Sequence, residues 1–136
     1  MGTLTSFPNG LKVAGFIPPT DATITVGTED TNVVNVAIQL TDGNGDDLAN
    51  VAAVYFYISD DSGGDGVAAT APAGGIAIGT DGKIAQVVSG KAGWLISEAD
   101  GDIDIDVTET GTDTFYLVLI LPSGETVVSS ALSFTA

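Results

Sequence analysis

From residue 22 onward, short runs of alternating hydrophobic and polar residues are separated by clusters of glycine, aspartate, asparagine, serine or proline. In residues 33–40, Val34, Val36 and Ile38 alternate with more polar positions, which predicts a strand with one face in the core and the other in water. No stretch keeps a period of 3.6 residues, so no helix is predicted. The predicted strands are residues 22–26, 33–40, 51–59, 75–78, 83–88, 94–97, 102–108, 114–121 and 126–134.

Many short strands at this spacing are typical of an all-β fold, and turns such as residues 42–45 and 121–124 supply the tight connections. A chain of 136 residues with 44% hydrophobic positions is long enough for one core. The prediction is an all-β, immunoglobulin-like Greek-key β-sandwich of about seven to nine strands over residues 21–136, with an extended N-terminal arm over residues 1–20. Residues 60–74, with four glycines and three aspartates, are predicted to be a mobile loop.

Two runs within the predicted strands, residues 51–58 and 114–121, are hydrophobic on both faces. If they are neighbouring central strands, Tyr55, Tyr57 and Tyr116 share one outward face, and such a face suits a protein interface. An equally weighted alternative is that the arm or a long loop folds over this face. A competing interpretation makes Tyr116 a tyrosine corner, which would turn its side chain inward.

The charge balance excludes several classes of partner and chemistry. Three lysines stand against eighteen carboxylates, giving a net charge of -15, so we expect neither nucleic acid nor a membrane surface as a partner. The absence of cysteine and histidine removes disulfides, thiolate zinc sites and the commonest general base. We expect no enzymatic activity, no catalytic residues and no cofactor.

The first twenty residues differ from the rest, since they contain Lys12 and no acid. They mix hydrophobic side chains with turn formers and show no period long enough to fold alone. The beginning also lacks the pattern of a secretory signal, so synthesis in the cytosol is expected. We predict that this arm binds a partner surface, through Phe7, Pro8, Leu11, Phe16 and Ile17.

Asp102, Asp104 and Asp106 alternate along one predicted strand, a spacing that looks like the paired-carboxylate motif of laminarinase-type glycoside hydrolases. Aspartate replaces the glutamate of that motif, and a solvated charged face that protects a sheet edge is the favoured interpretation. Trp94 lies beside Leu95 and Ile96, so it is predicted to be a core residue rather than a ligand-stacking one.

Oxygen-bearing side chains in residues 42–47 resemble the first half of an EF-hand loop. Asp42, Asn44 and Asp46 occupy positions 1, 3 and 5, but Asp47 stands at position 6 and Ala53 at position 12, so the set is incomplete. A hairpin turn with acidic side chains is the favoured interpretation, and no metal site is predicted.

Most of the chain resembles small virion proteins of tailed bacteriophages that decorate the head or project from it as head fibres. The resemblance rests on residues 6–11, 33–45, 57–61, 79–82, 97–104 and 114–124. It implies a non-enzymatic structural protein on the outside of the capsid, bound to the major capsid protein or another head protein, as a homo-oligomer. Because similar sandwiches serve in adhesins, the alternative is a tail-associated or cell-surface adhesion module that binds carbohydrate.

Overall fold

The computed structural model describes residues 16–135, which form ten β-strands and no helix. No part of this range could cross a membrane as a long apolar helix. The strands are β1 (Asp21–Val26), β2 (Val33–Thr41), β3 (Ala53–Ser59), β4 (Gly75–Ile78), β5 (Lys83–Val88), β6 (Ala92–Ile96), β7 (Asp102–Thr108), β8 (Thr114–Ile120), β9 (Thr126–Val128) and β10 (Leu132–Ser133).

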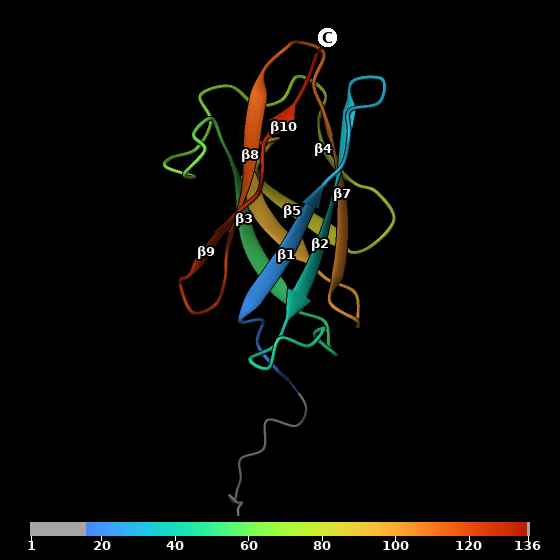
Figure 1. Cartoon of the computed structure of the whole chain (residues 1–136), viewed down its shortest axis with the longest axis vertical. Helices are drawn as coiled ribbons and strands as arrows, with labels where there is room; N and C mark the ends of the chain where they lie inside the picture. Colours follow the sequence, from blue (N-terminus) through green and yellow to red (C-terminus); the bar gives the residue numbers. More distant parts are fainter. Residues whose placement is uncertain (1–15, 136) are drawn as a thin grey trace, which may run out of the picture.

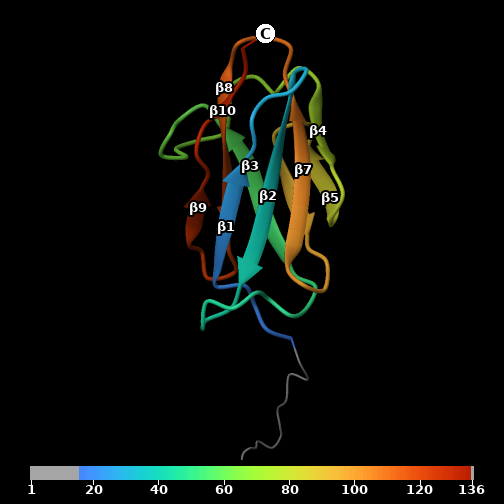
Figure 2. The ribbon, with the colours of Figure 1, turned by 45° about the vertical axis from the view of Figure 1, so that its right-hand side comes forward.

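Two antiparallel sheets pack face to face (Figure 1). The first has the order β1-β2-β7-β4, and the second has the order β10-β8-β3-β6-β5 with β9 also paired to β8. Figure 2 shows β1, β2 and β7 side by side, with β3 passing behind them. The chain crosses between the sheets from β2 to β3 and from β7 to β8, as strands B–C and E–F do in immunoglobulin-like domains. The predicted immunoglobulin-like Greek-key sandwich is confirmed, with the β5–β6 hairpin added beside β3.

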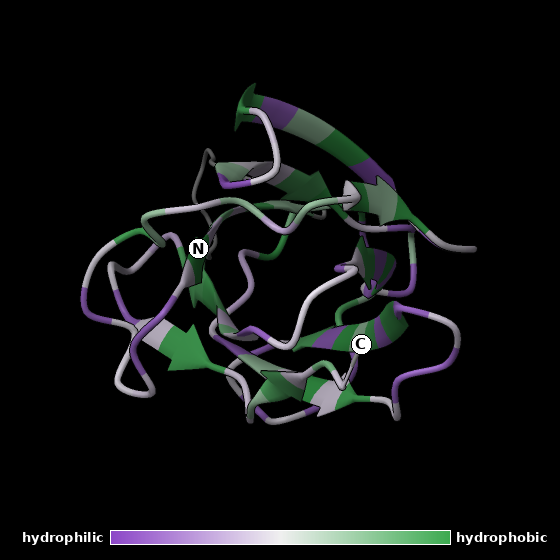
Figure 3. Ribbon diagram, turned by 90° about the horizontal axis from the view of Figure 1, so that it is seen from above, coloured by the Kyte–Doolittle hydropathy of each residue, from purple (hydrophilic) through white to green (hydrophobic). Residues whose placement is uncertain are grey.

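The inward positions of the two sheets form one core. The predicted alternation is confirmed in β2 and β7, whose buried residues are Val34, Val36, Ile38, Leu40, Ile103, Ile105 and Val107. Phe56 of β3 is fully buried between the sheets. Seen end-on in Figure 3, the strands surround this interior and several are striped with hydrophobic and hydrophilic residues. Each fully buried aliphatic or aromatic side chain stabilises the fold by roughly 1.5–3 kcal/mol.

The last predicted strand, residues 126–134, is divided in the structure. The backbone N–H of Leu117 donates to the hydroxyl oxygen of Ser129 over 2.9 Å, and the N–H of Ser129 donates to the carbonyl of Leu117 over 2.9 Å. A side-chain hydroxyl therefore replaces a backbone partner in the ladder, and the pairing is interrupted there. β9 and β10 consequently pair with different parts of β8.

Candidate binding face

The outer surface of the second sheet carries the chain's tyrosines. In the pairing of β3 with β8, Tyr55 lies opposite Ile120, Tyr57 opposite Val118 and Ser59 opposite Tyr116. The two doubly hydrophobic runs are therefore neighbours, and the prediction that the three tyrosines share an outward face is confirmed. The tyrosine-corner interpretation is wrong, because the flanking residues of Tyr116 on β8 are buried and turn its side chain outward. We call this surface the aromatic face: Tyr55, Tyr57, Ala85, Trp94, Ile96, Tyr116, Val118 and Ile120.

Trp94 belongs to this face, so the prediction that it is a core residue is wrong. It is 45% exposed and lies opposite Tyr55 in the pairing of β6 with β3. The two rings meet edge to face, with centroids 5.3 Å apart and an interplanar angle of 79°. Because Leu95 is fully buried, its neighbour on the strand must point outward, and this alternation was the signal available in the sequence.

The loop of residues 60–74 covers part of the aromatic face. The Tyr57 hydroxyl donates to the carbonyl of Gly64, and Val118 beneath it is only 1% exposed. A methyl group added at Gly64 would come within 3.0 Å of the side chains of Val118 and Val128. The alternative that a long loop folds over the face is therefore correct for the part that contains Tyr57 and Val118.

The same loop, which the sequence predicts to be mobile, makes several hydrogen bonds in the structure. One carboxylate oxygen of Asp61 accepts the backbone N–H groups of Gly63 and Asp65, over 2.8 and 3.2 Å. The backbone N–H of Ala69 donates to the Asp60 carboxylate over 2.9 Å, and the Lys91 ammonium donates to the Ala69 carbonyl over 2.8 Å. Its aspartates thus fold the loop locally instead of solvating it.

The rest of the aromatic face is more open, because Trp94 and Ala85 are exposed and the remaining side chains are half-buried. We call this part the open half: Tyr55, Ala85, Trp94, Ile96 and Ile120. Lys83, opposite Ile96 on β5, lies at its rim. The strands of this sheet contain no aspartate or glutamate. Although the chain has a net charge of -15, the open half presents aromatic and aliphatic side chains and no carboxylate from its strands.

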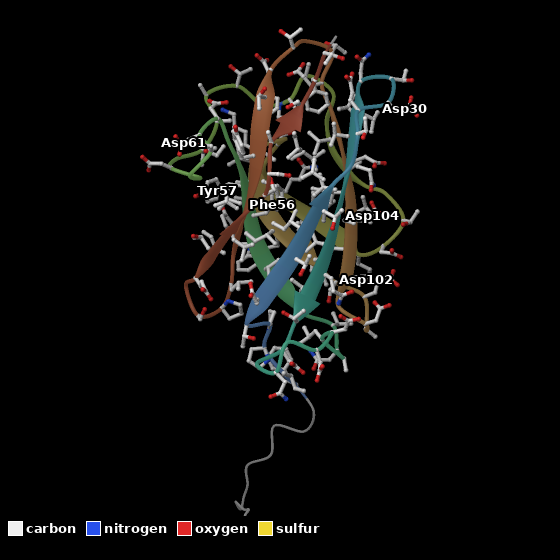
Figure 4. The ribbon with its side chains drawn as sticks, viewed as in Figure 1. Asp30, Phe56, Tyr57, Asp61, Asp102 and Asp104 are labelled. Atoms are coloured by element: carbon white, nitrogen blue, oxygen red, sulfur yellow. The ribbon has the colours of Figure 1, made fainter. Side chains whose placement is uncertain are left out.

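The outer surface of the first sheet, β1-β2-β7-β4, has the opposite character. Asp102, Asp104 and Asp106 alternate with buried residues of β7 and so point outward, as predicted. Figure 4 shows Asp102 and Asp104 on the other side of the molecule from Tyr57 and Asp61, with Phe56 between. We call this surface the acidic face. The predicted edge-protecting role is wrong, because β7 lies between β2 and β4 and is not an edge strand.

Neighbouring side chains hold the carboxylates of the acidic face. The Asn35 amide donates to Asp104 and, over 2.9 Å, to Asp106, and the Thr80 hydroxyl donates to Asp104 over 2.8 Å. Partial burial raises the pKa of Asp102 above its usual value, and the negative charges of Asp100 and Asp81 raise it further. The negative charge of Asp102 is therefore disfavoured in the folded protein.

The turn at residues 42–46 uses its oxygens internally. The Asp42 carboxylate accepts the backbone N–H groups of Asn44 and Asp46, over 2.9 and 3.1 Å. This is the hydrogen-bonding pattern of an Asx turn, in which the carboxylate closes the hairpin. Within residues 16–135, no three histidine, cysteine or acidic side chains are grouped so that they could hold a metal ion.

The predicted arm lies only partly in the described range. Phe7, Pro8 and Leu11 are outside the described residues, whereas Phe16 and Ile17 are exposed. The described chain begins at the lower end of the sandwich in Figure 1. The backbone of Ile17 is tied to the Asn50 amide group by two hydrogen bonds of 2.9 and 3.1 Å. The structure therefore brings the start of the body against the loop that precedes β3, and not onto the tyrosines.

Sequence reasoning missed Val51, which follows Asn50 and is 52% exposed. Val51 lines a shallow recess together with Lys83, Ile96 and Glu98. Since Ile96 belongs to the open half, Val51 extends the hydrophobic surface of that half into this recess. The sequence analysis includes residue 51 in the predicted strand 51–59, but β3 begins at Ala53, so Val51 lies in the loop before the strand.

No protein-family model and no curated protein matches the chain. Among solved structures, it is similar to a cohesin module from the Clostridium perfringens ATCC13124 family 33 glycoside hydrolase, with 16% sequence identity and a TM-score of 0.42. The match covers 86% of this chain and 94% of that module. Similarity at this level does not indicate what this chain binds.

Proposed function

We propose that this chain is a non-enzymatic structural module that binds the outer surface of a tailed-bacteriophage capsid as a decoration protein. Its partner is the major capsid protein or another head protein. The open half, around Tyr55 and Trp94, lies against the capsid, and the acidic face is turned to the surroundings of the virion.

The observation that supports this proposal is that the two outer faces differ in charge and in aromatic content. Carboxylates occur on the strands of one sheet and are absent from the strands of the other. Exposed aromatic side chains beside aliphatic ones are the usual centre of a protein interface, and they bind most strongly where charge is absent. The opposite, acidic face keeps neighbouring copies soluble and repels the phosphates of nucleic acid.

The predicted homo-oligomer remains a prediction in this proposal. Free copies of net charge -15 repel one another, so we expect copies to gather on the assembled shell, where each is already held by the capsid. Light scattering of the free protein tests the prediction: a stable oligomer in dilute solution would show that copies associate without the shell, and a monomer would leave the shell as the place where they gather.

The experiment compares matched variants of the two faces in their binding to purified heads. Replacing Tyr55 and Trp94 by alanine should weaken co-sedimentation at least about a hundredfold, because two central aromatic anchors are lost. The control replaces Thr23 and Thr25, outward residues of β1 in the first sheet, by alanine and should bind within about twofold of the parent. Circular dichroism verifies that both variants are folded. Equal binding by both variants would contradict the proposal.

A second candidate function, carbohydrate binding by an adhesion module, is favoured by the exposed ring of Trp94 beside Tyr55. Aromatic rings offer sugars an apolar stacking surface. Screening the protein against a glycan array separates the two functions. Saturable glycan binding that is lost when Trp94 is replaced by alanine, without binding to heads, would favour the adhesion module.

A further inference from the structure

Strand β5 forms one edge of the second sheet. It is last in the strand order and pairs with β6, and no other strand of residues 16–135 pairs with it. Figure 2 shows it at the margin of the sandwich. Residues 85–89 are all exposed, and Val87 is 65% exposed. The side-chain amide of Gln86 donates to the carbonyl of Ile76 on β4 over 3.1 Å, so a side chain rather than a strand joins the two sheets here. One side of the β5 backbone is therefore open to an added strand.

The β5–β6 hairpin differs in charge from the rest of the described chain. Residues 82–97 contain Lys83 and Lys91 but no aspartate, glutamate or proline, whereas the whole chain has a net charge of -15. These two lysines are the only basic residues within residues 16–135. A lysine on an edge strand disfavours the addition of most strands, whereas opposite charges on neighbouring strands stabilise a sheet. The edge therefore selects a strand that brings a carboxylate to Lys83.

The edge also continues the open half. Tyr55 lies opposite Trp94, and Trp94 lies opposite Ala85, so the three form one row across the sheet. Lys83 lies two positions from Ala85 and so points to the same outer face. The backbone pairs with β6 from Lys83 to Gln86 without a break, and a bulge follows. A strand added here would place one side chain beside Ala85 and another, two positions along, beside Lys83.

We propose that the partner binds this edge by strand addition: an extended segment of the head protein pairs with β5 along residues 83–86. The segment carries an aspartate or glutamate beside Lys83 and a hydrophobic residue beside Ala85. Backbone hydrogen bonds to β5 hold the segment, and its hydrophobic side chain packs towards Trp94. This inference rests on the proposed function and names the part of the partner that lies beside the open half.

The head protein is favoured over a second copy as the source of this segment. A second copy would bring another body of net charge -15 beside the first, and that repulsion opposes pairing. Two paired β5–β6 hairpins would also bring lysines to the contact without a carboxylate from either. A segment with an acid and a hydrophobic residue two positions apart complements both Lys83 and the row that contains Trp94.

Hydrogen exchange of backbone amides tests strand addition directly, because pairing protects amides that side-chain docking leaves exposed. Exchange is measured on the free protein and on the protein bound to purified heads. In β5, exchange should slow at least roughly tenfold on binding. Strand β1 is the matched control, since it is also a six-residue edge strand but belongs to the first sheet, and its exchange should not change.

Substitution of Lys83 tests the chemistry of the partner segment. Lys83→Glu places like charges opposite each other and should weaken co-sedimentation with heads at least roughly tenfold. Lys83→Arg keeps the positive charge and should bind within about threefold of the parent. Circular dichroism verifies that both variants are folded. Equal binding by the two variants would show that no carboxylate lies beside Lys83 and would overturn the proposal.

The other outcomes separate this proposal from the proposed function. If heads bind the parent and exchange in β5 is unchanged, the partner does not add a strand, and only this proposal is overturned. If exchange in β5 slows in the free protein as its concentration rises, a second copy occupies the edge, which also overturns it. If the parent does not bind heads, the proposed function is wrong, and this proposal is wrong with it.

Discussion

The two outer faces of the sandwich are built on the same alternating pattern but carry opposite chemistry. On β7 every outward position from 102 to 106 is an aspartate, and Asn35 and Thr80 donate hydrogen bonds to Asp104 and Asp106. On β3 and β6 the outward positions carry Tyr55 and Trp94, whose rings contact each other. The inward residues of both sheets therefore determine the fold, whereas the outward residues can differ and determine which molecules each face binds.

The largest expected effect is on stability, and it compares a buried residue of β7 with an outward one. Ile105→Ala removes a fully buried side chain and should lower the free energy of unfolding by about 2–5 kcal/mol. Asp106→Ala, on the adjacent outward position, should cost less than about 1 kcal/mol, since it removes an exposed hydrogen bond from Asn35. Urea denaturation measures both values. A comparable loss in the two variants would show that the acidic face is part of what holds the sheet together.

A smaller effect distinguishes the covered part of the aromatic face from the open half. Tyr57→Phe removes the hydrogen bond to the Gly64 carbonyl and should lower the free energy of unfolding by about 1 kcal/mol, with faster amide exchange in residues 60–74. Tyr55→Phe removes a hydroxyl from the open half and should change stability by less than about 0.5 kcal/mol. If the two variants are equally stable and loop exchange is unchanged, the Tyr57 hydroxyl does not hold the loop.

The smallest effect is the pH dependence of stability. The folded-state pKa of Asp102 is raised, chiefly by partial burial and then by Asp100 and Asp81, so the folded protein takes up this proton before the unfolded chain does. Stability should therefore increase as the pH falls from neutral through that raised value. Melting temperatures across this range measure the increase, and Asp102→Asn should reduce it. If the melting temperature of Asp102→Asn depends on pH as that of the parent does, Asp102 does not cause the increase.

At still lower pH, stability should decrease as the pH falls. Hydrogen bonds from the Thr135 hydroxyl and backbone N–H lower the pKa of Glu29 in the folded protein. Its stabilising contribution is complete above the unfolded-state pKa and is lost as the pH falls through the lowered folded-state value. The melting temperature should therefore pass through a maximum on acidification, and Glu29→Gln should weaken the decline on the acid side. A decline of the same steepness in Glu29→Gln would contradict this role.

Much of the fold could be predicted from the sequence because core residues repeat with the period of a strand. The nine predicted strands all occur, and the pairing of β3 with β8 follows from their hydrophobic character on both faces. The division of β9 from β10 could not be predicted, since it depends on a hydroxyl that bonds to Leu117, twelve residues away.

The candidate site was less predictable than the fold, because the roles of its residues depend on contacts that composition does not reveal. Trp94 is large and hydrophobic, so its type favoured the core, and only its register against buried Leu95 places it outside. The composition of residues 60–74 also does not reveal that the carboxylates of their aspartates accept backbone N–H groups within the loop. In both places, what a side chain contacts decided its role, and composition alone does not carry that information.

The central claim, that the open half is turned to the assembly and the acidic face away from it, can be tested by site-specific crosslinking. A photo-crosslinking aromatic amino acid is placed at position 94 in one sample and at position 25, on the opposite sheet, in another, and each is bound to heads before irradiation. The account predicts that position 94 captures a head protein and that position 25 captures none. Capture of a head protein from position 25 alone would contradict the account.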